Sequence, residues 1–158
     1  MKKAILPALL ALAIVTPGAQ AGTRKLDGKF NRADINADHQ LSPAEFQATQ
    51  SKRISVAYSL FRFNKTDTNN DGFVSLEEFR ISRGGISGGK PTKMDIFLLA
   101  DADDDDVLDP TEYVNTLPSG SAYPKALRSF DKKDKDNTGT LTPTEFGIRA
   151  GGGIPFPF

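Results

Sequence analysis

Cysteine is absent from the 158-residue sequence, which also contains only one histidine. The chain therefore forms no disulfide and has no thiol nucleophile for covalent catalysis. A glycine motif that cradles phosphate is missing as well. Lys and Arg number 20 and Asp and Glu number 20, with no basic block. This balance gives no indication of a surface for nucleic acid or for an anionic membrane.

Long hydrophobic runs are also missing. The longest run, residues 4–15, is too short for a transmembrane helix, which needs roughly twenty apolar residues. It follows a pair of lysines and precedes the small-residue pattern AQA at residues 19–21. These features together are typical of a secretory signal peptide. We therefore predict a signal peptide over residues 1–21, cleaved after Ala21, and export to a bacterial periplasm or secretion.

What the sequence does contain is a regular placement of oxygen-bearing side chains, clearest in residues 67–78. With Asp67 as position 1, such side chains occupy positions 1, 3 and 5, and a glutamate closes the stretch at position 12. Gly72 at position 6 permits a sharp turn with positive φ. Calcium takes about six to eight oxygen ligands, which this spacing supplies from one short loop. The predicted ligands are Asp67, Asn69, Asp71, the backbone carbonyl of Phe73, and Glu78.

The same pattern occurs four times, about every 33 residues, which is typical of repeated supersecondary units. We number the loops 1 (residues 34–45), 2 (67–78), 3 (101–112) and 4 (134–145). Repetition at one period argues against chance acidic turns. The predicted ligands are Asp34, Asn36, Asp38, the carbonyl of Gln40 and Glu45 in loop 1; Asp101, Asp103, Asp105, the carbonyl of Val107 and Glu112 in loop 3; and Asp134, Asp136, Thr138, the carbonyl of Thr140 and Glu145 in loop 4.

Apolar residues repeat together with the loops. A phenylalanine precedes each loop by four residues, an aromatic residue follows each loop, and position 8 is always aliphatic. We interpret these residues as the core-facing positions of an entering helix, an exiting helix and a short strand. In loop order they are Phe30, Phe46 and Leu41; Phe63, Phe79 and Val74; Phe97, Tyr113 and Leu108; and Phe130, Phe146 and Leu141.

On these residues the chain resembles the EF-hand superfamily, with four hands as in calmodulin-like proteins. The resemblance covers about residues 26–150. It implies an all-α fold of four helix–loop–helix units in two pairs, each pair with a short two-stranded ribbon between its loops. It also implies that the residues named above bind up to four calcium ions.

Departures from the family pattern predict unequal sites. Loop 1 has His39 at position 6, where glycine adopts left-handed backbone more easily, so we expect weaker binding than at loop 2. Loop 3 has Asp106 there and is the most acidic of the four. Calcium would relieve the repulsion of its carboxylates, so we expect this loop to drive calcium-coupled folding. Loop 4 has the uncharged Thr138 at position 5 and is expected to bind weakly or to stay empty.

Helix boundaries are predicted from capping residues. Position 9 of every loop is Ser, Thr or Asp, and position 12 is Glu, which together form a capping box for the exiting helix. Residues 22–33 should form the first entering helix, which Gly28 weakens. Residues 44–70 contain neither Gly nor Pro. We therefore expect only a short kink between the first exiting helix and the second entering helix, near residues 50–53.

The segment RGGISGGK, residues 83–90, contains four glycines and predicts a flexible joint between the two pairs. The apolar tail GGGIPFPF is either disordered or docks Phe156 and Phe158 in an apolar groove. The predicted organisation is a signal peptide (1–21), an N-terminal pair (22–83), a linker (84–90), a C-terminal pair (91–150) and the tail (151–158).

Two functions remain open from the sequence. One is a calcium sensor or buffer, although Met94 is the single methionine after residue 21, so a Met-rich target groove is not indicated. The other is a calcium-stabilised structural or adhesion module with permanently filled sites. No enzymatic function is predicted, because the acidic residues are assigned as ligands. The expected partners are calcium ions and an unidentified protein, with neither nucleic acid nor a transmembrane segment in the mature chain.

Overall fold

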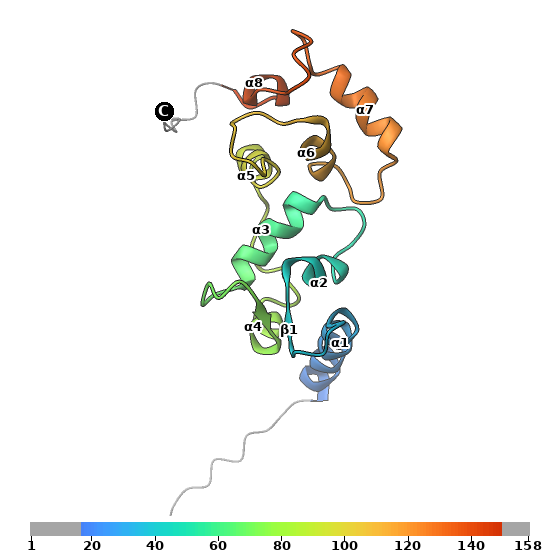
Figure 1. The fold of residues 1–158 in the computed structure, drawn as a ribbon. Helices are drawn as coiled ribbons and strands as arrows, with labels where there is room; N and C mark the ends of the chain where they lie inside the picture. Colours follow the sequence, from blue (N-terminus) through green and yellow to red (C-terminus); the bar gives the residue numbers. More distant parts are fainter. Residues whose placement is uncertain (1–16, 150–158) are drawn as a thin grey trace, which may run out of the picture.

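The computed structural model describes residues 17–149, whose regular secondary structure is mostly helical, with loops between the helices (Figure 1). The first 16 residues of the predicted signal peptide and the predicted tail lie outside the described residues. Within residues 17–149, no helix is both long and apolar enough to span a bilayer.

Each loop lies between two helices, so the chain is a series of four helix–loop–helix units. The elements are α1 (Pro17–Ala33), β1 (Gln40–Leu41), α2 (Pro43–Ala48), α3 (Val56–Thr66), β2 (Val74–Ser75), α4 (Leu76–Ile81), α5 (Lys93–Leu98), α6 (Pro110–Asn115), α7 (Tyr123–Asp131) and α8 (Pro143–Phe146). The predicted all-α fold is confirmed. The first entering helix is longer than predicted, because it extends to Pro17 and continues through Gly28 without a break.

Capping boxes begin the exiting helices α2, α4, α6 and α8, as predicted. In each, the side chain at position 9 accepts a hydrogen bond from the backbone N–H of the glutamate at position 12, whose carboxylate accepts one in return. Proline in the first turn of α2, α6 and α8 favours helix initiation. A further capping box, formed by Thr92 and Asp95, starts α5 at Lys93 and was not predicted.

The connection between α2 and α3 differs from the prediction. Residues 49–55 are not helical, so the expected short kink is a complete break. Ser55 then caps α3 by accepting a hydrogen bond of 3.0 Å from the Tyr58 N–H. A tertiary contact supports the break, because the Ile54 carbonyl accepts a hydrogen bond of 3.1 Å from the Ser119 N–H.

The position 8 residues pair within each half of the chain, as the resemblance implies. Strands β1 and β2 are antiparallel, with Leu41 opposite Val74. In the second half, Leu108 and Leu141 exchange two backbone hydrogen bonds of 2.9 and 2.8 Å in an isolated bridge. All four side chains are fully buried. Each bridge therefore joins two loops at the centre of a core.

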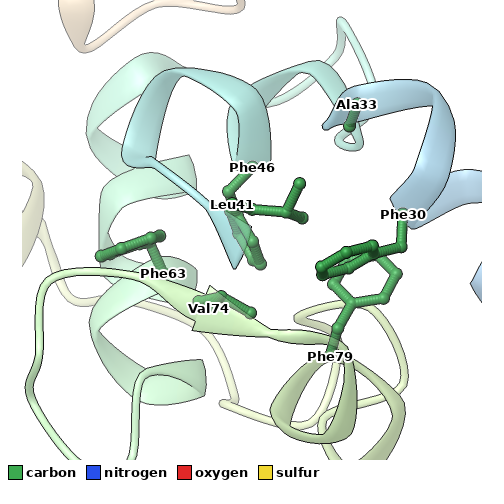
Figure 2. Close-up of a cluster of buried hydrophobic side chains, with 7 residues drawn as sticks. All are labelled: Phe30, Ala33, Leu41, Phe46, Phe63, Val74 and Phe79. Carbon is green, nitrogen blue, oxygen red and sulfur yellow. The ribbon is translucent and has the colours of Figure 1, made fainter. Parts of the chain in front are cut away.

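The first pair of units encloses a hydrophobic cluster (Figure 2). Phe46 meets Phe63 and Phe79 edge-to-face, with ring centroids 5.6 and 6.1 Å apart. Phe30 meets Phe79 in the same way at 5.7 Å. Such pairs add stability beyond the buried area alone. The cluster consists of Phe30, Ala33, Leu41, Phe46, Phe63, Val74 and Phe79.

A second cluster fills the other pair of units. Tyr113 contacts Phe130 edge-to-face at 5.7 Å, and its hydroxyl lies 2.8 Å from the Ser129 hydroxyl, which satisfies the polar end of the ring. Phe146 is only partly buried, so this core is less closed than the first. The cluster consists of Ala57, Phe97, Ala100, Leu108, Tyr113, Phe130 and Leu141.

The first part of the glycine segment packs onto the first core. Gly84 and Gly85 are buried, and a Cβ on Gly85 would collide with the Phe46 ring. The Gln50 side chain donates a hydrogen bond of 3.2 Å to the Gly84 carbonyl and accepts one of 3.0 Å from Arg62. These contacts hold the beginning of the segment against α2 and α3.

Candidate metal centres

All four loops share one backbone conformation. The residues at positions 4 and 6 have positive φ in every loop, so the backbone turns sharply at both positions. The φ angles are 58° and 65° at Ala37 and His39, 57° and 84° at Asn70 and Gly72, 57° and 64° at Asp104 and Asp106, and 56° and 85° at Asn137 and Gly139. His39 and Asp106 therefore adopt the left-handed conformation that the sequence required of position 6.

The aspartate at position 1 stabilises this turn. In each loop one carboxylate oxygen accepts a hydrogen bond of 3.0 to 3.1 Å from the backbone N–H of position 6. The other oxygen accepts from the N–H of position 5 in loops 2, 3 and 4, at 3.2 to 3.3 Å. The position 1 carboxylate thus lies inside the curve of the loop in all four cases.

The glutamate at position 12 closes each loop against its own start. One carboxylate oxygen accepts from the backbone N–H of position 2 and the other from the N–H of position 9, with distances between 2.7 and 3.0 Å. Each Glu112 oxygen accepts only this one bond and keeps a second lone pair for a metal. In loops 1, 2 and 4 the position 9 hydroxyl also donates to the glutamate at 2.8 Å, and in loop 2 the Thr68 hydroxyl donates to Glu78 at 2.9 Å. Bidentate coordination by these three glutamates requires the hydroxyls to turn away. The same residue therefore caps the exiting helix and reaches across the loop.

Hydrogen bonds keep two of these glutamates, Glu78 and Glu145, ionised. Burial would raise the pKa of Glu78, but hydrogen bonds from Ser75 and Thr68 outweigh it and lower the pKa to about 2. Hydrogen bonds from Lys135 and Thr142 lower the pKa of Glu145 to about 2. Both groups are therefore anionic at neutral pH, as a calcium ligand must be.

Loops 1 and 2 place an amide at position 3. In loop 2 the Asn69 side chain donates to the Asp71 carboxylate at 2.9 Å, and its carbonyl accepts from the Asp71 N–H at 3.0 Å. Asn36 and Asp38 repeat this arrangement in loop 1, at 2.8 and 3.2 Å. The predicted ligands at positions 3 and 5 are thus neighbours in both loops.

Loops 3 and 4 concentrate carboxylates instead. Oxygen atoms of Asp101, Asp103 and Asp105 lie within 4.8 Å of one another, and so do those of Asp134, Asp136 and Glu145. Glu112 is not part of the first group, whereas Glu145, which accepts the same bonds from positions 2 and 9, belongs to the second.

Burial raises the pKa of the first carboxylate of loop 3, that of Asp101. The nearby charges of Glu112 and Asp105 also raise this pKa, whereas hydrogen bonds from two loop N–H groups lower it. A bound cation would remove this penalty on the charged form.

Loop 4 has ligand groups that bond to one another and carboxylates that are more exposed than those of loop 3. The Thr138 hydroxyl donates to the Asp136 carboxylate at 2.8 Å and lies 3.3 Å from the Thr140 carbonyl, two of the predicted ligand groups. Asp134 and Glu145 are also less buried than the corresponding residues of loop 3. Greater solvent screening weakens electrostatic attraction, which agrees with the expectation of a weaker site.

Loop 1 contains a buried carboxylate oxygen that a cation could coordinate. Asp34 Oδ1 is buried and has no hydrogen-bond partner, because the Asp38 N–H bonds to Asn36 and not to Asp34. A buried carboxylate oxygen without a partner costs free energy. The predicted metal ligands of the loop are carboxylate, amide and backbone oxygens, a set that suits a hard cation such as calcium. The residues of the loops therefore fit this ion.

Sequence reasoning missed the conformation of position 4. It concentrated on glycine at position 6, whereas position 4 is also left-handed in every loop. A signal was present, because Asn70, Asp104 and Asn137 are residue types that tolerate this conformation. Ala37 is the exception and gave no signal.

The match to a known family is local. The sequence model of the EF hand matches residues 62–81, which span the end of α3, loop 2 and α4. This segment is therefore similar to an EF hand. A search of curated proteins found no match.

Several solved structures share a likeness in fold at low identity. A homologue of programmed cell death 6 protein from Leishmania major is 21% identical, with 77% of this chain and 68% of that chain covered and a TM-score of 0.35. A redox protein from Chlamydomonas reinhardtii is 18% identical over 85% of this chain and 49% of that one, with a TM-score of 0.36. Caltubin from the great pond snail is 19% identical over 78% and 93%, with a TM-score of 0.39. These likenesses carry no functional conclusion for this chain.

Proposed function

We propose that this protein binds calcium at up to four loops and acts outside the cytoplasm as a calcium sensor or buffer. The observation that carries the proposal is the hydrogen-bond frame common to all four loops, in which positions 1 and 12 bring their carboxylates to the inside of the turn. The EF-hand match supports it for loop 2. The ligands are those named for each loop from the sequence.

A structural module with permanently filled sites is the second candidate. It is favoured by the buried cores of both pairs and by loops already shaped by their own hydrogen bonds, since a static module needs little rearrangement when the ion binds, whereas a sensor opens an apolar groove. Affinity separates the two functions, because sensors bind in the range of about 10⁻⁷ to 10⁻⁵ M and extracellular modules at about 10⁻⁴ to 10⁻³ M.

Calorimetric titration of metal-free residues 22–158 with calcium tests the proposal. Three or four sites with micromolar constants support a sensor or buffer. Constants near millimolar support the structural module. Absence of saturable binding overturns the assignment of the loops.

Adjacent glutamates provide a matched pair of variants in loop 2. Glu78→Gln changes the position 12 residue, whose exposed fraction is 9%, and should abolish one calcium site. Glu77→Gln removes the same charge from a side chain that is 74% exposed and should leave the number of sites unchanged. Equal effects of the two variants would mean that net charge, not coordination, determines binding.

Export is proposed from the sequence of residues 1–21. Cleavage after Ala21 would remove the beginning of α1 and leave Asp27 and Phe30 in the remaining helix. Expression of the full chain in a bacterial host with a periplasm tests this. The expected product is a periplasmic or secreted protein whose N-terminus is Gly22, and an uncleaved cytoplasmic product would contradict it.

The proposed function is binding and not catalysis. The carboxylates that could act as acids or bases are engaged in the loop frames, where hydrogen bonds hold Glu78 and Glu145 in the ionised form at neutral pH. The expected partners are calcium ions and a protein that remains to be identified.

A further inference from the structure

Helix α3 contributes to both hydrophobic cores, and Figure 1 shows it between the other helices of the first pair and helices α5 and α6 of the second pair. Ala57, in its first turn, is 0% exposed and belongs to the cluster of the second pair. Phe63 is 4% exposed and belongs to the cluster of the first pair. The helix ends at Thr66, and its C-cap residue Asp67 is position 1 of loop 2. One rigid element therefore runs from the second core to a candidate calcium site of the first pair.

Backbone hydrogen bonds attach the start of α3 to the second pair. Ser55 and Pro118 form an isolated antiparallel bridge. The Ser119 N–H donates to the Ile54 carbonyl at 3.1 Å, and the Gly120 N–H donates to the Lys52 carbonyl at 3.3 Å. We call these contacts, together with the packing of Ala57, the seam.

Both helices that flank loop 3 are connected to α3. Helix α5, which enters loop 3, packs against α3. Helix α6, which leaves loop 3, is followed directly by the residues that form the seam. A change in the angle between α5 and α6 therefore changes at least one contact with α3. Calcium binding to loops of this kind acts on that angle.

We propose that loop 3 and loop 2 are thermodynamically coupled through α3, so that calcium at loop 3 raises the calcium affinity of loop 2. The inference rests on the proposed calcium binding and adds its regulation. It is distinct from coupling within a pair, where the Leu41–Val74 ribbon joins loops 1 and 2 and the Leu108–Leu141 bridge joins loops 3 and 4. Coupling is reciprocal, so calcium at loop 2 favours loop 3 equally.

The sign of the coupling follows from the shape of the loops. With the seam formed, loops 2 and 3 both have left-handed positions 4 and 6 and both have a closed position 12. The arrangement of α3, α5 and α6 that satisfies the seam is therefore compatible with both binding-competent loops at once. A ligand that stabilises this arrangement at one loop favours it at the other.

The test disables loop 3 and measures loop 2 in the full mature chain. Glu112→Gln weakens loop 3, while Asp104→Asn removes one charge from the same loop at position 4, where loops 2 and 4 already have asparagine. The NMR signals of the Gly72 and Gly139 amides report on loops 2 and 4 during calcium titration. We expect Glu112→Gln to weaken binding at Gly72 by about fivefold or more, the lower end of typical allosteric coupling. Asp104→Asn should change it less than about twofold.

A seam variant separates coupling from general damage. Ala57→Leu overpacks the contact between α3 and the second core, and Ala57→Ser is the milder substitution if the first does not fold. In either background Glu112→Gln should no longer affect Gly72. Ala44→Leu, at an exposed position of α2, is the matched control and should leave the coupling intact.

The outcomes distinguish this inference from the proposed function. If both glycine signals titrate but Gly72 is indifferent to Glu112→Gln, the coupling is wrong and calcium binding stands. Coupling that persists unchanged in the Ala57 variants would overturn the route through the seam. If neither signal shows saturable binding, the proposed function itself fails.

Discussion

The guanidinium of Arg80 on α4 donates two hydrogen bonds, each of 2.8 Å, to the carboxylate of Asp27 on α1. This bidentate pair joins the first entering helix to the second exiting helix across the first pair of units. The same two helices contribute Phe30 and Phe79, whose rings meet edge-to-face in the first core. Its geometry is the one in which an arginine–carboxylate pair is strongest.

The Asp27–Arg80 pair should make stability depend on pH. The hydrogen bond from Arg80 lowers the pKa of Asp27, so the folded state binds the proton less tightly than the unfolded state does. The contribution is therefore present above the ordinary carboxyl pKa of 3.8 and is lost as the pH falls through the lower folded value. Asp27→Asn should lower the unfolding temperature at pH 7 and have little effect in strong acid, measured without calcium.

The control for this prediction is Glu77→Gln. Glu77 lies 3.9 Å from Arg80 but is largely exposed, and such pairs contribute little. A deficit of Asp27→Asn that is the same at neutral and acid pH would show that ionisation of Asp27 does not matter.

Alanine substitutions at Gly85 and Gly89 distinguish the stability lost to steric collision from that lost to backbone strain. Their φ angles are +79° and +78°, but a Cβ on Gly85 would collide with the Phe46 ring, whereas nothing lies within 4 Å of one on Gly89. Both alanine substitutions adopt left-handed backbone, which costs about 1–2 kcal/mol. Gly85→Ala should cost about 1–3 kcal/mol more because it also overpacks the core. Urea unfolding of the two variants measures the difference, and equal losses would contradict the packing of this segment on the first core.

Ala37 is the least suitable residue for its conformation in the four loops. Its φ of 58° is left-handed, and its side chain makes no compensating hydrogen bond. Ala37→Gly should stabilise the protein by up to about 1 kcal/mol, because relief of the strain exceeds the extra entropy of glycine in the unfolded chain.

Ala44→Gly, in helix α2, is the opposite control for this prediction. It should destabilise by about 0.5–1 kcal/mol, since α2 has no left-handed residue to relieve. Thermal unfolding of both variants provides the comparison. A loss of stability in Ala37→Gly comparable to that in Ala44→Gly would mean that the left-handed turn carries no strain.

Leu141 and Leu98 test the importance of the position 8 bridge. Leu141 is 0% exposed, while Leu98 is 54% exposed. Leu141→Ala should destabilise by about 2–5 kcal/mol because it leaves a cavity in the second core. Leu98→Ala should change stability by less than about 1 kcal/mol. Chemical unfolding distinguishes them, and a small effect at Leu141 would mean that the second core tolerates collapse around the bridge.

Much of each loop could be predicted from local sequence. In loop 2 the sequence predicted the first ligand Asp67, the turn at Gly72 and the closing residue Glu78. Each of these features depends on residues within one short segment. The four capping boxes were predictable for the same reason. Local sequence did not predict that the Thr138 hydroxyl turns toward Asp136, because a hydroxyl is free to choose between donors and acceptors nearby.

The connections between units were less predictable. Residues 44–70 contain no Gly or Pro, and yet the helix breaks at 49–55, where the Ile54 carbonyl finds a partner in Ser119. The glycines of residues 83–90 predicted a flexible joint, whereas Gly85 is buried against Phe46. In both cases the decisive contact comes from a residue far away in the chain.

The sequence by itself determined the four helix–loop–helix units, the oxygen side chains of each loop and the apolar positions of both cores, because periodic spacing and helix caps act over a few residues. Only the tertiary structure decided that α3 belongs to both cores, that Arg80 pairs with Asp27, and that the seam joins the two pairs. These features depend on contacts between distant segments, whose free energy exists only once the chain has folded.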